Sequence, residues 1–249
     1  SLADHPIRSP YPRGTRKRLM KNRFLVCNIG WMDKYDGLGK GVKIVGGASF
    51  IKKKGWGNEI YNFRRYKGHF CGGLFPGRFK GYDKSINIDN IGALQGHDEI
   101  HGVTVIWTAP RPSGGTFVVG WYKNATVYRT EQDAPPRSRR QIPKRKSESC
   151  GYYVEANAKD GKLLENDLRT LEVPRFKKGG MGISSVWFAH RTPLGRKFLR
   201  KVTPLIQMGS PLKKLQKKKS KLSLPRQSDL EQRQKIERLA MEATTRWYE

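Results

Sequence analysis

The strongest structural signal in the chain lies between residues 117 and 128. This segment reads Phe117-Val118-Val119-Gly120-Trp121-Tyr122-Lys123-Asn124-Ala125-Thr126-Val127-Tyr128. Apolar, β-branched runs open and close it, which predicts two buried strands with a break at Gly120. Aromatic faces stack on bases, lysine binds phosphate, and an amide hydrogen-bonds to a base edge. The segment therefore predicts either a nucleic-acid contact or a strand whose Trp121 and Tyr122 belong to the core.

The charge of the chain favours the first alternative. Its 249 residues include 50 Lys and Arg against 21 Asp and Glu, a formal net charge of +29. Such an excess favours a polyanionic partner, because neutralising phosphates releases counterions. We expect nucleic acid, with DNA favoured over RNA, and rank an anionic membrane second. No apolar run is long enough to span a bilayer and no signal-peptide pattern is present, so the sequence predicts a cytoplasmic protein without a membrane partner.

The cysteines and histidines predict neither a metal site nor a cofactor. The three cysteines, Cys27, Cys71 and Cys150, are far apart and form no CxxC pair, so we expect free, mostly buried thiols. His97 and His101 have the spacing of helical zinc ligands, but the glycines that bracket them predict a turn. The oligomeric state is left open.

Composition divides the chain into four parts. Apolar runs separated by glycine and proline fill the second part and predict an α+β, mainly β fold, with a curved sheet or a small barrel bearing long basic loops. Ser228 and Glu231 have capping-box spacing, which predicts a C-terminal helix. Its apolar face continues to the last residues, so we expect the first helix of a truncated domain; a helix packed back on the sheet is the alternative. The predicted parts are a basic arm 1–23, a β-rich nucleic-acid recognition domain 24–190, a basic linker 191–227 and this helix 228–249.

Four segments place a Trp beside glycine, which lets the backbone approach a ligand closely. They are residues 28–31, 55–59, 120–124 and 179–187. We predict that they converge into an aromatic pocket for a flipped base, lined by Trp31, Trp56, Trp121, Tyr122 and Trp187. Successive strand residues point to opposite faces, so we expect Trp121 to face the ligand and Tyr122 to pack inside.

Polar residues near these segments complete the predicted site. Asn28, Asp89 and Asn124 would read the base edge, because carboxylates and amides accept hydrogen bonds from exocyclic amines. The predicted phosphate contacts are Lys123, Arg129, Arg175, Lys177, Lys178 and the backbone at Gly180, where a glycine-rich turn could form an amide nest. The proline- and arginine-bearing residues 131–149 predict a surface loop, with or without phosphate contact.

Four stretches together carry a family resemblance. They are Phe24-Leu25-Val26-Cys27-Asn28-Ile29-Gly30-Trp31-Met32, Ile86-Asn87-Ile88-Asp89-Asn90-Ile91-Gly92-Ala93, residues 118–129, and residues 169–175 with Gly179-Gly180-Met181-Gly182. Across about residues 24–188 the chain resembles the N-terminal recognition module of bacterial modification-dependent restriction and phage-defence nucleases. The helix from Ser228 resembles the start of the nuclease-related domain that often follows.

The pattern of strand, glycine, aromatic pair and strand is similar to the PUA-like superfamily, which includes SRA, YTH and EVE modules. The resemblance implies a PUA-like β-barrel that recognises a modified base in DNA as the reader of an antiviral restriction system. It also implies a non-catalytic fragment of a longer endonuclease, with no catalytic residue assigned.

Two other functions stay open. A nuclease with its active site inside this chain could use Asp160, Glu165 and Lys162, a triple that is common by chance. An RNA-binding ribonucleoprotein component would use the basic tails on folded RNA.

Overall fold

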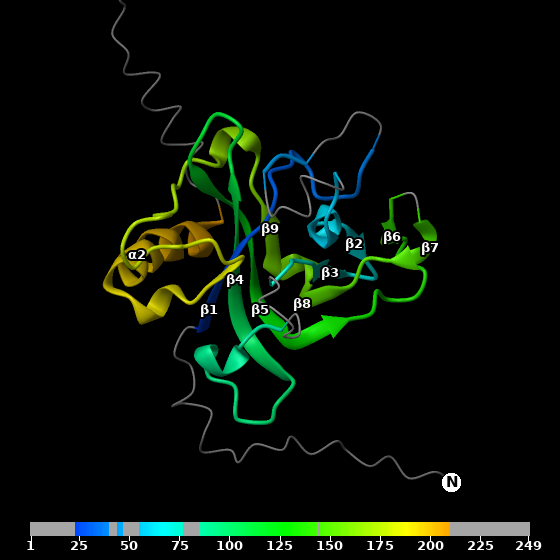
Figure 1. Cartoon of the computed structure of the whole chain (residues 1–249), viewed down its shortest axis with the longest axis horizontal. Helices are drawn as coiled ribbons and strands as arrows, with labels where there is room; N and C mark the ends of the chain where they lie inside the picture. Colours follow the sequence, from blue (N-terminus) through cyan, green and yellow to red (C-terminus); the bar gives the residue numbers. More distant parts are fainter. Residues whose placement is uncertain (1–22, 40–43, 47–54, 77–84, 144, 210–249) are drawn as a thin grey trace, which may run out of the picture. The chain divides into compact units, whose positions relative to one another are not determined.

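The computed structural model describes residues 23–39, 44–46, 55–76, 85–143 and 145–209. The described elements (Figure 1) are strands β1 (Arg23–Asn28), β2 (Arg65–Tyr66), β3 (His69–Gly72), β4 (Glu99–Pro110), β5 (Thr116–Gln132), β6 (Gln141–Ile142), β7 (Arg145–Ser149), β8 (Tyr152–Asn157), β9 (Gly161–Leu163) and β10 (Val186–Trp187), the α-helix α2 (Pro193–Met208), and the 3-10 helices η1 (Asn58–Tyr61), η2 (Ile88–Ile91), η3 (Ala158–Asp160), η4 (Asn166–Leu168) and η5 (Ala189–Arg191).

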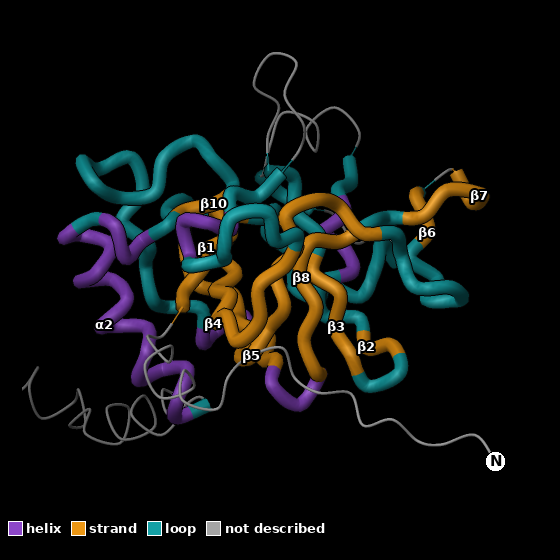
Figure 2. The backbone as a smooth tube through the Cα atoms, turned by 90° about the horizontal axis from the view of Figure 1, so that it is seen from below, coloured by secondary structure: helices purple, strands orange, loops and turns teal. Residues whose placement is uncertain are grey.

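One large sheet organises the domain. Its strands follow the order β10-β1-β4-β5-β8-β3-β2, with β9 paired to β5 outside this path (Figure 2). β1 runs parallel to β4, and the other pairings are antiparallel. The α+β, mainly β prediction is confirmed, but the sheet is open between β10 and β2 and is not closed into a barrel.

The sheet is covered on both faces. Val26 pairs with Ile106, which in turn pairs with Trp121, so these side chains form one row on one face. The row continues to Trp187 of β10, whose ring lies 5.6 Å from that of Phe198 in α2. The helix therefore packs on this face at the edge strand β10.

The opposite face carries the larger core. Leu25, Val105 and Tyr122 form the matching row there, and all three are fully buried in one apolar cluster. Adjacent strand residues thus alternate between two buried faces, and most of the middle of β5 is buried on both.

The predicted break at Gly120 is wrong, because β5 runs unbroken from Thr116 to Gln132. The glycine permits a close approach instead. A Cβ atom there would lie 2.4 Å from the carbonyl oxygen of Lys162 in β9 and 2.7 Å from the ring of Phe63. The register of β4 against β5 does shift beside it, because Trp107 pairs with Gly120 and Thr108 with Val118, and two further shifts lie between Ile100 and Val105.

The helix α2 moves the domain boundary. The predicted linker began at residue 191, yet residues 193–208 form a helix whose apolar side is buried. Its start is capped by Thr192, whose side chain accepts a hydrogen bond from the Gly195 amide at 3.0 Å. The compact unit that contains the sheet extends to Gly209.

Other local predictions had mixed outcomes. The apolar run Ile86–Ile88 leads into η2 and forms no strand, and residues 171–173 contribute only an isolated bridge between Glu172 and Phe117. The predicted surface loop 131–149 contains the hairpin of β6 and β7. The cysteine prediction is confirmed: Cys27, Cys71 and Cys150 are all free and buried. The arm 1–22, residues 210–227 and the helix 228–249 lie outside the described residues.

Candidate nucleic-acid interface

The predicted aromatic cage does not form around the 120–124 segment. Trp121 is 1 % exposed and Tyr122 is 0 % exposed, so neither ring face is available to a base. The Tyr122 hydroxyl donates a hydrogen bond to the Asn62 carbonyl, inside the core. The two rings do point to opposite faces as predicted, but the prediction that Trp121 faces the ligand is wrong, because its indole is buried.

Trp31 and Trp187 also lie in packed surroundings, each 8 % exposed. The ring of Trp31 faces two guanidinium groups, with the Arg169 carbon 4.9 Å and the Arg111 carbon 5.5 Å from its centroid. Arg169 is itself fully buried and donates to the Met32 carbonyl at 2.7 Å. These contacts make Trp31 a packing residue, and Trp187 packs on α2 as described above.

Two predicted edge-reading residues are engaged within the protein. Asn28 is 9 % exposed, and its Oδ1 accepts a hydrogen bond from Arg175 at 3.2 Å. Asp89 accepts from Arg129 at 2.7 Å and 3.4 Å, which lowers the pKa of the exposed carboxyl. Arg129 also donates to the His97 carbonyl at 2.9 Å. The predicted base reader Asp89 and the predicted phosphate contact Arg129 are therefore partners of each other.

Lys123 and Asn124 lie at a bulge in β5. Val103 pairs with Ala125 and Val105 with Tyr122, so both intervening residues of β5 stand opposite the single residue between them in β4. Asn124 is exposed and adopts a left-handed backbone with φ 51°, a conformation that asparagine tolerates better than most residues. The bulge, and not a strand break, brings Asn124 to the surface.

The glycine-rich turn at Gly180 does not form the predicted amide nest. The Gly180 amide donates to the Lys177 carbonyl at 2.8 Å, and the Met181 amide donates to the Pro174 carbonyl at 2.9 Å. A Cβ atom at Gly180 would lie 2.1 Å from that Pro174 oxygen, so glycine is required for the tight turn itself. Lys177 and Lys178 remain exposed on the turn, where the prediction placed them.

A basic groove lies beside this turn. Its volume is about 640 Å³, and the β4–β5 turn, residues 171–177 and α2 form its walls. Five cations line it against one carboxylate, that of Glu172; the cations are Arg111, Arg175, Lys177, Lys197 and Lys201. We call this feature the basic groove.

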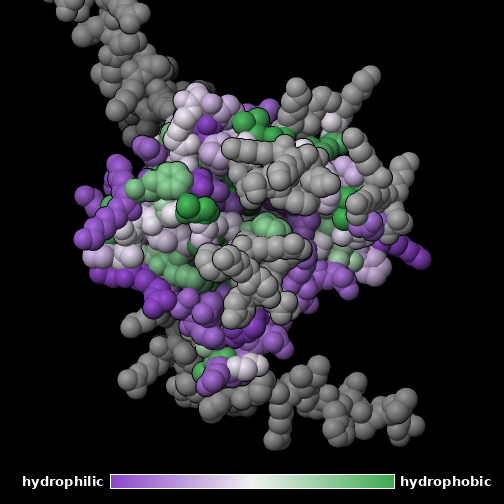
Figure 3. Space-filling model, viewed as in Figure 1, coloured by the Kyte–Doolittle hydropathy of each residue, from purple (hydrophilic) through white to green (hydrophobic). Residues whose placement is uncertain are grey.

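The amphipathic pattern of α2 produces one wall of the basic groove. Phe198, Leu199 and Val202 are buried, which turns the intervening cations outward. Lys197 and Lys201 are one helical turn apart and line the groove together. Figure 3 shows hydrophilic side chains gathered over the place of α2, at the left of the view, with apolar atoms beside them.

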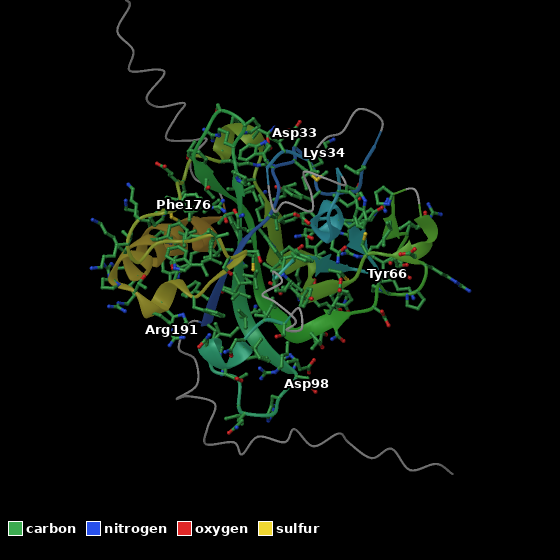
Figure 4. The ribbon with its side chains drawn as sticks, viewed as in Figure 1. Asp33, Lys34, Tyr66, Asp98, Phe176 and Arg191 are labelled. Atoms are coloured by element: carbon green, nitrogen blue, oxygen red, sulfur yellow. The ribbon has the colours of Figure 1, made fainter. Side chains whose placement is uncertain are left out.

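Arg175 is the cation of the basic groove with the most unusual surroundings. Its Nε is buried and has no hydrogen-bond partner among the described residues, and desolvation lowers the pKa of its guanidinium. The guanidinium carbon lies 4.8 Å from the ring centroid of Phe176, the next residue. Phe176 is 72 % exposed and points outward from the same side of the sheet as α2 (Figure 4).

A second cavity, of about 390 Å³, holds the remaining predicted aromatic, Trp56. Phe75 and Tyr153 also line it, together with polar groups from η1 and from the end of β5. Its acidic lining residues are Glu59, Glu131 and Asp133, and no Lys or Arg is among the lining residues that the structure describes. We call it the Trp56 pocket.

Internal hydrogen bonds hold the walls of the Trp56 pocket. Glu59 is 3 % exposed and accepts from the Gly30 amide at 3.2 Å, and desolvation raises the pKa of its carboxyl. Glu131 accepts from the Asn58 side chain at 2.5 Å. The carboxylates in the walls of the Trp56 pocket thus offer hydrogen-bond acceptors, whereas the cationic side chains of the basic groove offer hydrogen-bond donors.

Arg140 has a structural role, although the sequence placed it in a basic surface loop. It is 3 % exposed, and its guanidinium donates to five backbone carbonyls. The acceptors are Asn58, Tyr61, Cys71, Cys150 and Gly151, at 2.8–3.4 Å. One side chain therefore ties η1, β3 and the turn before β8 together.

Sequence reasoning missed Arg111, Phe176, Glu131, Asp133 and Phe75. Each of them acquires its place in a cavity only when segments distant in the sequence meet. The cations between Lys177 and Lys201 were visible as a run: residues 173–209 carry eight Lys and Arg and no Asp or Glu.

Neither a cluster of metal ligands nor a membrane-spanning helix occurs among the described residues. No group of three or more His, Cys, Asp or Glu side chains there could hold a metal ion, and Asp160 and Glu165 belong to no such group. No helix of those ranges is long and apolar enough to cross a membrane. Comparisons with family models, curated proteins and solved structures found no match to the chain.

Proposed function

We propose that the chain is a nucleic-acid-binding module, with DNA as the favoured ligand, that holds backbone phosphates in the basic groove. The observation that carries this proposal is the groove itself, where five cations meet one carboxylate. Cations on fixed elements meet phosphates at defined positions, and the release of counterions supplies the affinity. The net charge of +29 adds long-range attraction for the same ligand.

The finer part of the proposal is recognition of a modified base in the Trp56 pocket. Trp56 and Phe75 are the partly exposed aromatic residues of its lining, and a cavity of about 390 Å³ is larger than one base needs. Glu131 and Asp133 supply acceptors, which suit a base that presents an exocyclic amine. The family resemblance supports the same function, as the reader of a cytoplasmic restriction or defence protein.

The basic groove is tested by reversing two of its charges. Lys197→Glu/Lys201→Glu should weaken binding to a labelled duplex at least tenfold at 100 mM salt, because two phosphate contacts become repulsive. The slope of log affinity against log salt should fall by about 2, since each phosphate contact contributes about one.

The matched control is Arg65→Glu/Lys67→Glu, with the same change in net charge. Both residues are exposed and lie at β2, the far edge of the sheet from α2, where Figure 4 labels Tyr66. The control should lose much less affinity than the groove variant. Equal losses would mean that diffuse charge alone drives binding, and no binding by the wild type at 50 mM salt would refute the proposal.

The Trp56 pocket is tested with Trp56→Ala on unmodified, methylated, hydroxymethylated and glucosylated duplexes, with single strands and structured RNA alongside. Loss of one stacking contact should cost about 1–3 kcal/mol for the preferred ligand only. A uniform loss across the panel would contradict base recognition at this pocket. A preference for structured RNA would identify RNA, and not DNA, as the ligand.

A further inference from the structure

Phe176 is an apolar ring on a strongly basic surface. It is 72 % exposed, and its neighbours along the chain are Arg175, Lys177 and Lys178. Single exposed hydrophobic residues are common and by themselves mean little. The backbone at Phe176 is what sets this residue apart.

The backbone of Phe176 is left-handed, with φ 58°. A bulky residue in this region costs about 1–3 kcal/mol and persists only where the surrounding structure imposes it. Two contacts impose this backbone conformation: the Phe176 amide donates to the Met181 carbonyl at 2.8 Å, and Arg175 forms a β-bridge with Met181. The tight turn at Gly180, described above, closes the loop.

This loop therefore holds an aromatic ring outward at a cost in stability, with little burial to offset it. Phe176 also lines the basic groove, together with Arg175 and Lys177. The Arg175 guanidinium lies 4.8 Å from the ring centroid and supports one side of the ring. A rigid ring flanked by phosphate-binding cations matches what a base-stacking or wedge residue requires.

We propose that Phe176 inserts against the bases of the nucleic acid whose phosphates occupy the basic groove. Arg175, Lys177 and Lys178 hold the flanking backbone, and the ring stacks on an exposed base or enters an opened base step. This inference rests on the proposed function, and it adds contacts with base faces to the phosphate contacts of the basic groove. Charge complementarity selects this occupant, because residues 173–209 contain no acidic residue that would suit a basic partner.

The experiment compares Phe176→Ala with two controls on one duplex that carries 2-aminopurine, a base whose fluorescence rises when it unstacks. Phe176→Ala should bind about 5- to 150-fold more weakly, the range for one stacked base. Its salt slope should match that of the wild type, because no phosphate contact is removed. The wild type should raise the 2-aminopurine signal, and the alanine variant should not.

Leu94→Ala is the matched control, since Leu94 is 63 % exposed in the segment between η2 and β4 and lies outside the groove. Its affinity should equal that of the wild type. Phe176→Tyr keeps the ring and should restore both affinity and signal. Melting temperatures of all variants should stay within about 2 °C, because neither side chain is packed in the core.

Three results would overturn the inference. Unchanged affinity and signal in Phe176→Ala would refute the stacking role while leaving the proposed function intact. An equal loss of affinity for heparin, a polyanion without bases, would show that the ring does not act on bases. Failure of the wild type to bind any nucleic acid would refute the proposed function and this inference with it.

Discussion

Trp121→Ala should destabilise the domain strongly while leaving nucleic-acid affinity unchanged. The indole is 1 % exposed and lies in the row with Val26 and Ile106, beneath the segment that carries α2. A buried Trp removes about 150–250 Å² from water, which at about 25 cal/mol per Å² corresponds to roughly 4–6 kcal/mol as an upper value. Measured Trp-to-Ala changes in cores cost about 3–5 kcal/mol.

The assay is a urea or thermal unfolding curve paired with a binding titration. For a compact unit of this size, 3–5 kcal/mol should lower the melting temperature by about 6–20 °C. The titration is run well below the variant's melting temperature, so that the folded fraction is known. Phe176→Ala is the contrasting variant, because it should lose affinity and keep its stability.

The reasoning would be refuted by the reverse pattern at Trp121. A melting temperature within about 2 °C of wild type, combined with a tenfold or larger loss of affinity, would mean that the indole contacts the ligand and that the covering segment opens on binding. Such a result would restore the aromatic pocket that the 117–128 segment predicts.

Two further predictions concern buried charged groups. Arg140→Lys should lower the free energy of unfolding by about 2–4 kcal/mol, because an ammonium has three donors and leaves some of the five buried carbonyl acceptors unpaired. The control is Arg139→Lys, at the adjacent and exposed position. Equal stability of the two variants in urea would contradict the structural role of Arg140. Burial raises the pKa of Glu59 above its usual 4.5, so the folded state binds this proton more tightly than the unfolded state does. The wild type should therefore lose stability relative to Glu59→Gln as the pH rises through 4.5 and above. Parallel curves of stability against pH for the two proteins, between pH 4 and 8, would show that the carboxyl titrates normally.

The sequence by itself determined the coarse fold class, and its charge predicts a polyanionic ligand. Apolar, β-branched runs predict buried strands because such a strand needs only a short stretch of local sequence between turn signals. The strands at 23–28, 99–110, 116–132 and 152–157 follow from those runs. Charge is additive along a chain, so the cationic run from Arg175 to Lys201 is visible without any structure.

Burial on the second face of the sheet was decided only by tertiary structure. The alternation in β5 correctly places Trp121 and Tyr122 on opposite faces, but whether a face meets water depends on what packs against it. Residues distant in the sequence supply that cover, such as Met181 beside Thr108 and Phe198 beside Trp187, and local patterns contain no information on such contacts. For the same reason, the arginine-rich sequence around Arg140 does not predict that its guanidinium donates to five buried carbonyls.

The two cavities are also products of the tertiary fold. The basic groove combines a β-turn, a loop and a helix, and the Trp56 pocket combines η1 with the end of β5. Single residues such as Phe176 or Glu131 carry no signal in isolation, because their function depends on neighbours far away in the chain. A backbone angle such as φ 58° at Phe176 is fixed by hydrogen bonds to Met181 and by the turn at Gly180, so only the folded chain reveals it.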